Sequence, residues 1–160
     1  MTRRLFTAVA VAMLLVAASA YAEVTPIPPP YPHGCDVNGT ALQGDAAPNN
    51  LDGTPLRDLL RGGGQTDELS GLDAHDCLFG QTGHDYLDGG GALDILRGGA
   101  GMDHLGGGPG PDRITGGEGD DRVRDLRGQN TIDCGPGGFD RVTTNQRSRV
   151  APNCEHVLRR

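Results

Sequence analysis

Aliphatic residues recur every nine positions along most of the chain. The uninterrupted series is Leu51, Leu60, Leu69, Leu78, Leu87, Leu96, Leu105, Ile114, Val123 and Ile132. An acid or its amide stands two positions before each of them, at Asn49, Asp58, Asp67, Asp76, Asp85, Asp94, Asp103, Asp112, Asp121 and Asn130. Side chains alternate between the two faces of a strand, so each aliphatic residue fits the centre of a minimal strand, with its own side chain pointing inward.

Glycine is the second regular feature of the chain. Each position five residues before these acids is Gly from Gly44 to Gly116, and a second Gly often follows, as in Gly98-Gly99. A tight turn that visits positive φ and brings two backbones close together needs Gly, because a Cβ would obstruct it. The repeating unit G-G-x-G-x-D-x-aliphatic-x is therefore a Gly-rich turn followed by a short strand.

A short fixed period indicates small units that stack on copies of themselves to bury a shared apolar face. We predict an all-β fold, a parallel β-roll (β-solenoid) of tandem nonapeptides with two nonads in each coil. Its core is two inner columns of Leu, Ile and Val. A conventional globular core is excluded, because the chain has only three Phe, three Tyr and no Trp among 160 residues.

Stacked coils place residue i beside residue i+18 at about 4.8 Å, so the acids form two ladders. One ladder is Asp67, Asp85, Asp103 and Asp121, and the other is Asp58, Asp76, Asp94 and Asp112. If the turns are exposed, neighbouring charges repel by roughly 3 kcal/mol at an effective dielectric constant of about 20. A cation between the coils removes this repulsion. Carboxylate and carbonyl oxygens suit Ca²⁺ better than Mg²⁺ or Zn²⁺, so we predict that these eight Asp residues are calcium ligands.

Residues 98–105 and 116–123 resemble the nonapeptide of the RTX, or haemolysin-type, calcium-binding repeat family. The resemblance covers residues 44–133 in one phase. It implies a parallel β-roll in which the Asp at the sixth position and the turn carbonyls bind Ca²⁺ between coils. With weaker agreement the phase extends back to Cys35 and, after a one-residue slip at Cys134, forward to Asp140 and Val142.

Some repeats depart from the family unit. The Gly at its fourth position is replaced by Leu56, Gln65, Ala74 and Ala92. We therefore expect weak or no binding in the first copies. The best sites are expected around Asp85, Asp94, Asp103, Asp112 and Asp121.

The ends of the chain predict export. Residues 1–22 contain Arg3-Arg4, an apolar run and an A-x-A ending, which is typical of a cleaved secretory signal peptide rather than a membrane span. The Pro-rich residues 23–34 are predicted as a linker. We divide the remainder into an RTX-type β-roll at residues 35–143, whose residues 35–52 form a degenerate N-terminal cap, and a disulfide-bonded C-terminal cap at residues 134–160. The predicted location is extracellular, with no membrane span.

Four cysteines in an exported chain predict two disulfides, for which three connectivities are possible. Their positions favour Cys35 with Cys77 and Cys134 with Cys154. In that arrangement we expect each bridge to close one end of the roll, where a solenoid otherwise exposes its core.

Composition excludes several functions. The net charge of −7 makes nucleic acid a poor partner. The chain lacks Lys, which a phosphate-binding loop requires, and neither Ser70 nor Ser148 stands in G-x-S-x-G. We predict a protein that is not an enzyme, that binds calcium ions and that has an unidentified cell-surface or matrix partner. The alternative is a structural or adhesive extracellular solenoid with little bound metal, and the Ca²⁺ dependence of folding separates the two.

Overall fold

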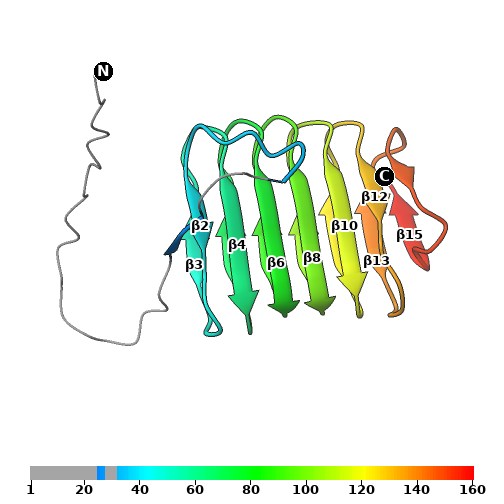
Figure 1. The fold of residues 1–160 in the computed structure, drawn as a ribbon. Helices are drawn as coiled ribbons and strands as arrows, with labels where there is room; N and C mark the ends of the chain where they lie inside the picture. Colours follow the sequence, from blue (N-terminus) through cyan, green and yellow to red (C-terminus); the bar gives the residue numbers. More distant parts are fainter. Residues whose placement is uncertain (1–24, 28–31) are drawn as a thin grey trace, which may run out of the picture.

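The computed structural model describes residues 25–27 and 32–160, and there the chain winds into a flattened parallel β-solenoid (Figure 1). One sheet contains, in spatial order, β1 (Thr25–Pro26), β2 (Ala41–Gln43), β4 (Leu59–Gly64), β6 (Cys77–Gly83), β8 (Ile95–Gly101), β10 (Arg113–Glu118), β12 (Thr131–Asp133) and β14 (Arg149–Val150). The other contains β3 (Asn50–Asp52), β5 (Glu68–Ser70), β7 (Tyr86–Asp88), β9 (His104–Gly106), β11 (Arg122–Asp125), β13 (Arg141–Thr144) and β15 (His156–Arg159). The predicted all-β roll is confirmed.

The register of the strands confirms two nonads per coil. Leu60 pairs with Leu78 and Leu78 with Leu96, always eighteen residues on, and these strands are parallel. Val123 pairs with Val142, which confirms the one-residue slip after the last regular repeats. Both sheets continue beyond residue 143 through β14 and β15, so the predicted C-terminal cap extends the solenoid.

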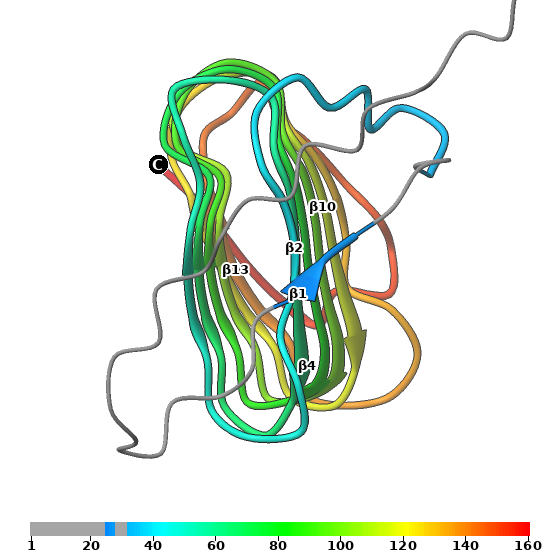
Figure 2. The same ribbon diagram turned by 60° about the vertical axis from the view of Figure 1, so that its left-hand side comes forward.

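The core lies between the two sheets, as the view in Figure 2 shows. The ten aliphatic residues of the nine-residue series are all exposed by 2% or less, and Val142 joins them. Each strand needs only one such residue, because both sheets contribute to the same thin layer. The periodic core predicted from the sequence is therefore confirmed.

The N-terminal part of the described chain adds to one sheet edge. Thr25 and Pro26, inside the predicted linker, pair antiparallel with Gln43 and Leu42 of β2. A proline is tolerated there because β1 is an edge strand. The predicted signal peptide 1–22 lies outside the described residues, as do residues 23–24 and 28–31 of the linker. The described segments contain no helix that is long and apolar enough for a membrane crossing.

The two disulfides have the predicted pairing, but only one closes an end. Cys134 and Cys154 join the C-terminal end of the core. Cys77 follows the strand alternation and points away from the core, because its neighbour Leu78 points inward. The bridge from Cys35 to Cys77 therefore fastens the N-terminal segment across the outer face of the eight-stranded sheet, where a second cluster includes Leu59.

Candidate calcium-binding corners

Each nonad forms one Gly-rich turn, which we call a corner and which runs from the Gly five residues before the acid to the acid itself. The eight predicted ligands are at most 2% exposed. The repulsion given above for exposed turns therefore does not describe these side chains, which are buried. The physical reason is the period of two: an acid two positions before an inward aliphatic residue shares its inward face.

One oxygen of each corner Asp joins successive coils. Asp85 Oδ1 accepts the backbone N–H of Asp67 at 2.8 Å, and Asp94 Oδ1 accepts that of Asp76 at 2.8 Å. The two predicted ladders therefore exist as hydrogen-bonded stacks. Asp140 continues one of them at a spacing of nineteen, because its Oδ1 accepts the N–H of Asp121 at 2.8 Å.

The other oxygen of most corner acids has no partner. Buried Oδ2 atoms without a hydrogen bond belong to Asp67, Asp76, Asp85, Asp94, Asp103, Asp112, Asp121, Asp125 and Asp140. Asp58 is the exception among the predicted ligands. Its Oδ2 accepts the backbone N–H of Thr54 at 2.7 Å and lies 3.2 Å from the Thr54 hydroxyl, which is also 3.1 Å from Oδ1.

Six of these unpartnered oxygens lie close to a backbone carbonyl of the next coil, those of Asp67, Asp76, Asp85, Asp94, Asp103 and Asp121. A Cβ added to Gly89 would stand 2.7 Å from Asp94 Oδ2 and 2.8 Å from the carbonyl oxygen of Gly107. Gly71 shows the same arrangement with Asp76 Oδ2 at 2.6 Å and Gly89 O at 2.5 Å. The first Gly of the unit is therefore needed to leave this small space free. Its oxygen-only lining fits a hard cation such as Ca²⁺.

Burial without a counter-charge raises the pKa values of these acids. Desolvation is the main cause, and it raises the pKa of Asp94 to about 8 and those of Asp76 and Asp121 to about 7. Neighbouring carboxylates on the same ladder raise them further; for Asp94 these include Asp112 and Asp76. The metal-free corners thus favour either a bound proton or a bound cation.

Most corners contain a single carboxylate. The described residues contain no group of three or more His, Cys, Asp and Glu side chains placed to hold a metal. Any ion bound at a corner therefore needs backbone carbonyls for most of its ligands. That requirement also favours Ca²⁺, which accepts carbonyl oxygens in flexible geometry, over Zn²⁺.

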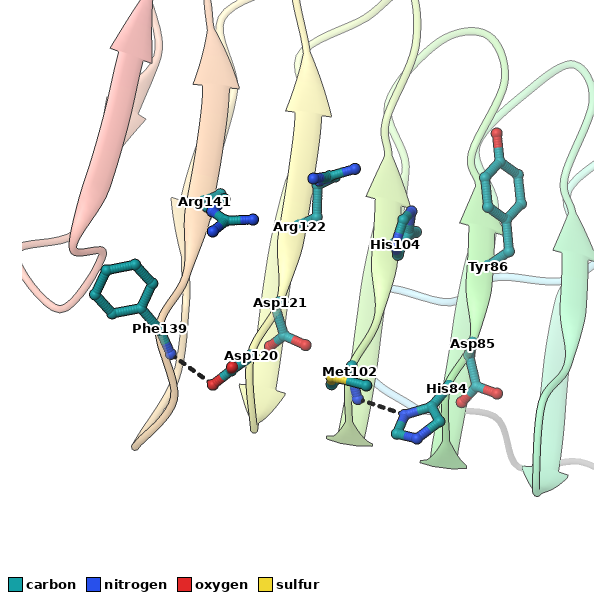
Figure 3. A pocket seen from close by; sticks show the side chains of 10 residues that line it. All are labelled: His84, Asp85, Tyr86, Met102, His104, Asp120, Asp121, Arg122, Phe139 and Arg141. Atoms are coloured by element: carbon teal, nitrogen blue, oxygen red, sulfur yellow. Dashed lines mark hydrogen bonds between the residues drawn. The ribbon is translucent and has the colours of Figure 1, made fainter.

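Two histidines join coils in a way that the sequence did not indicate. His84 Nδ1 accepts the backbone N–H of Met102 at 2.9 Å, which is the dashed contact in Figure 3. His75 Nδ1 accepts the N–H of Leu93 at 3.1 Å. Both histidines immediately precede a corner Asp, so their rings support the same turns.

A surface hollow of about 560 Å³ lies beside the corners of one ladder (Figure 3). Tyr86, His104, Arg122 and Arg141 come from successive coils and line it together with Phe139, Asp85 and Asp121. The two acids belong to buried corners. The hollow therefore brings solvent close to the carboxylates without exposing them.

The fourth-position substitutions affect the corners unequally. Gln65, Ala74 and Ala92 adopt φ values of 63°, 74° and 83°, the left-handed conformation that favours Gly. Asp67 and Asp76, which follow the first two, keep an unpartnered oxygen. Leu56 does not take this conformation. The backbone conformation at the fourth position therefore distinguishes the Asp58 corner from the later substituted corners.

Asp125 was missed by the sequence analysis as a candidate ligand. It is 2% exposed and stands where the repeat has its first Gly. Desolvation first, and the nearby Asp112 carboxylate as well, raise its pKa to about 7. The only sequence signal is the exchange itself, an acid in place of Gly followed five residues later by Asn130 in place of Asp.

The chain matches the family described as RTX calcium-binding nonapeptide repeat in four copies, at residues 43–76, 52–87, 70–105 and 106–138. These copies cover more than half of the chain and contain every corner from Asn49 to Asn130. No curated protein and no solved structure matches the chain.

Proposed function

Because the chain belongs to the RTX calcium-binding nonapeptide repeat family, we propose that it is a secreted protein whose Asp ladders and turn carbonyls bind Ca²⁺ between coils and so drive its folding. The observation that carries this proposal is the series of buried, unpartnered Oδ2 atoms, six of which lie beside a carbonyl oxygen of the next coil. A bound Ca²⁺ supplies the positive charge that the chain does not provide at these points.

The two carboxylate oxygens of each corner Asp have different proposed roles. Oδ1 holds the N–H of the preceding coil, as in the 2.8 Å bond from Asp85 N to Asp103 Oδ1, and this sets the spacing of the coils. Oδ2 and the facing carbonyls are the proposed ligands. The proposed set is Asp67, Asp76, Asp85, Asp94, Asp103, Asp112 and Asp121, with Asp58 as the weakest member because Thr54 already satisfies its second oxygen.

Two features support an extracellular role. The chain contains two disulfides, which persist in oxidising compartments. Extracellular calcium modules bind at about 10⁻⁴ to 10⁻³ M, a range suited to ligands that are mostly carbonyls. We assign a structural rather than a catalytic role, with calcium ions as the first partner and a cell-surface or matrix component as the unidentified second one.

Far-ultraviolet circular dichroism tests this proposal on the chain from residue 23, with both disulfides formed. In a chelator we expect a largely disordered chain, because uncompensated buried carboxylates oppose a core of small aliphatic columns. Added Ca²⁺ should produce β structure cooperatively at about 10⁻⁴ to 10⁻³ M. Mg²⁺ at the same concentrations is the control and should be much less effective.

Identical β spectra in chelator and in excess Ca²⁺ would contradict the folding role. That result would favour the alternative of a structural or adhesive solenoid in which disulfides and aliphatic packing suffice.

A further inference from the structure

Asp125 interrupts a column of glycines. The first positions of the corners on its side of the roll are Gly53, Gly71, Gly89 and Gly107, then Asp125 and Thr144. Asp125 is the register partner of Thr144 in the next coil. The last two coils therefore carry side chains where the earlier ones leave space.

The Asp125 side chain enters the inward space that the glycines leave free. Its Oδ1 accepts the backbone N–H of Arg127 at 3.3 Å, and its Oδ2 is buried without a partner. A Cβ added to Gly107 would clash with Oδ2 of both Asp125 and Asp112, so the two oxygens face the same point. Thr144 is fully buried, and its Oγ1 also has no hydrogen-bond partner.

In this coil the carboxylate stands at the first position of the repeat unit, at Asp125, and the sixth position, where most other corners have Asp, is Asn130. Asn130 occupies the sixth position, and its Oδ1 accepts the N–H of Asp112 at 3.0 Å as a ladder Asp would. Its amide donates to the carbonyl of Arg127 at 2.7 Å, so it needs no cation. This coil thus offers its carboxylate from the first position and faces Asp112 directly.

We infer that Asp112, Asp125 and Thr144 form a Ca²⁺ site in which two carboxylates face each other, unlike the one-carboxylate corners of the repeat. The inference rests on the proposed function. Two carboxylate oxygens and a hydroxyl are hard ligands, and their two negative charges match a divalent ion. The Arg127 guanidinium does not fill this place, since Arg127 is exposed and reaches Asp125 through its backbone.

An access route to this site exists. Asp125 lines a hollow of about 580 Å³ together with Asp88, Arg124 and Leu126. An ion can therefore reach the site from the surface of the roll. Asp88 lies on the same sheet and is exposed, which makes it a suitable control position.

Isothermal titration with Ca²⁺ tests the inference on Asp125→Asn, with Asp88→Asn as the matched control. Asp125→Asn should bind one Ca²⁺ fewer per chain than the wild type, whereas Asp88→Asn should bind the same number. An unchanged Ca²⁺ count in Asp125→Asn overturns the inference.

A second pair of variants keeps the test decisive if Asp125→Asn does not fold. Asp125→Gly should lose one Ca²⁺, and Asp125→Gly with Asn130→Asp should regain it by restoring the ordinary unit. Asp125→Gly that binds as many ions as the wild type overturns the inference. A wild-type chain that binds no Ca²⁺ overturns the proposed function itself, so the two failures are distinguishable.

Discussion

The Asp58 corner and the Asp103 corner share one chain path but differ in what satisfies the acid. Both side chains are 1% exposed, and both accept a backbone N–H from the preceding coil. The second oxygen of Asp58 accepts hydrogen bonds from Thr54, whereas that of Asp103 has no partner. A turn that brings its own donor makes a structural aspartate, and a turn without one leaves a carboxylate that needs a cation or a proton.

Asparagine corners provide a third solution. Asn49 donates its amide to the carbonyl of Ala47 at 2.6 Å, and Asn130 donates to Arg127 O at 2.7 Å. In these corners the amide supplies the hydrogen that pairs with a turn carbonyl. The corners of Asn49, Asp58 and Asn130, whose side chains are hydrogen-bonded within their own turns, thus flank the series from Asp67 to Asp121. Every corner in that series contains an unpartnered oxygen.

The largest expected effect is the response of the metal-free chain to pH. Folding raises the pKa of Asp67 and Asp103 to about 6, of Asp76 and Asp121 to about 7, and of Asp94 to about 8, above the ordinary value of 3.8. Such groups contribute stability that is fully present below about pH 4 and is lost as the pH rises through 6 to 8. In chelator, lowering the pH from 8 towards 4 should therefore increase β structure measured by circular dichroism.

The Asp94→Asn variant sharpens this pH test. This substitution removes the acid whose pKa is raised to about 8, so the loss of β structure with rising pH should be complete at a lower pH than in the wild type. With Ca²⁺ present, protons compete for the same oxygens, so the Ca²⁺ midpoint should rise as the pH falls. A metal-free chain whose β content is unchanged from pH 4 to pH 8 would contradict the account of the corners.

A matched pair of amide substitutions tests the two corners directly. Asp103→Asn should lower the number of bound Ca²⁺ and raise the Ca²⁺ midpoint of folding, because Asp103 lies between Asp85 and Asp121 on its ladder. Asp58→Asn should keep the Ca²⁺ number. It should lower the free energy of unfolding by about 1–3 kcal/mol, since both Asp58 oxygens accept backbone N–H groups and an amide cannot do so.

Titration calorimetry gives the Ca²⁺ numbers for this pair, and urea unfolding in excess Ca²⁺ gives the stabilities. Equal Ca²⁺ losses in the two variants, or a larger loss in Asp58→Asn, would mean that an unpartnered oxygen does not identify the sites.

The smallest expected effect comes from replacing Asn49, whose amide already donates to a carbonyl of its own turn, by an acid. Asn49→Asp removes the amide donor to Ala47 O and places a carboxylate near Asp45, which Asn49 also contacts at 3.2 Å. At the lowest Ca²⁺ concentration that folds both chains, the free energy of unfolding should fall by about 1–3 kcal/mol relative to the wild type, and excess Ca²⁺ should recover part of this loss. Urea unfolding of this variant and of the wild type at low and at excess Ca²⁺ measures both, and a loss that excess Ca²⁺ does not reduce would show that this corner cannot hold an ion.

Much of this molecule follows from its period. The nine-residue spacing of Leu, Ile and Val predicted the inner columns, the eighteen-residue register and the two Asp ladders. The slip after Cys134, with Asp140 and Val142 in phase, was also predictable. The inward direction of the Asp side chains follows from the same alternation.

By itself the sequence determined the solenoid and its register, because a repeated short unit has only one way to bury its aliphatic side chains. It favoured one of three possible disulfide pairings, and the structure confirms that pairing. Only the tertiary structure decided which acids have satisfied oxygens and which do not. That depends on donors from turns and neighbouring coils, such as Thr54 at Asp58, and on close approaches, such as Asp112 to Asp125 across Gly107. Such contacts are set at distances near 3 Å, which a pattern of residue types does not specify.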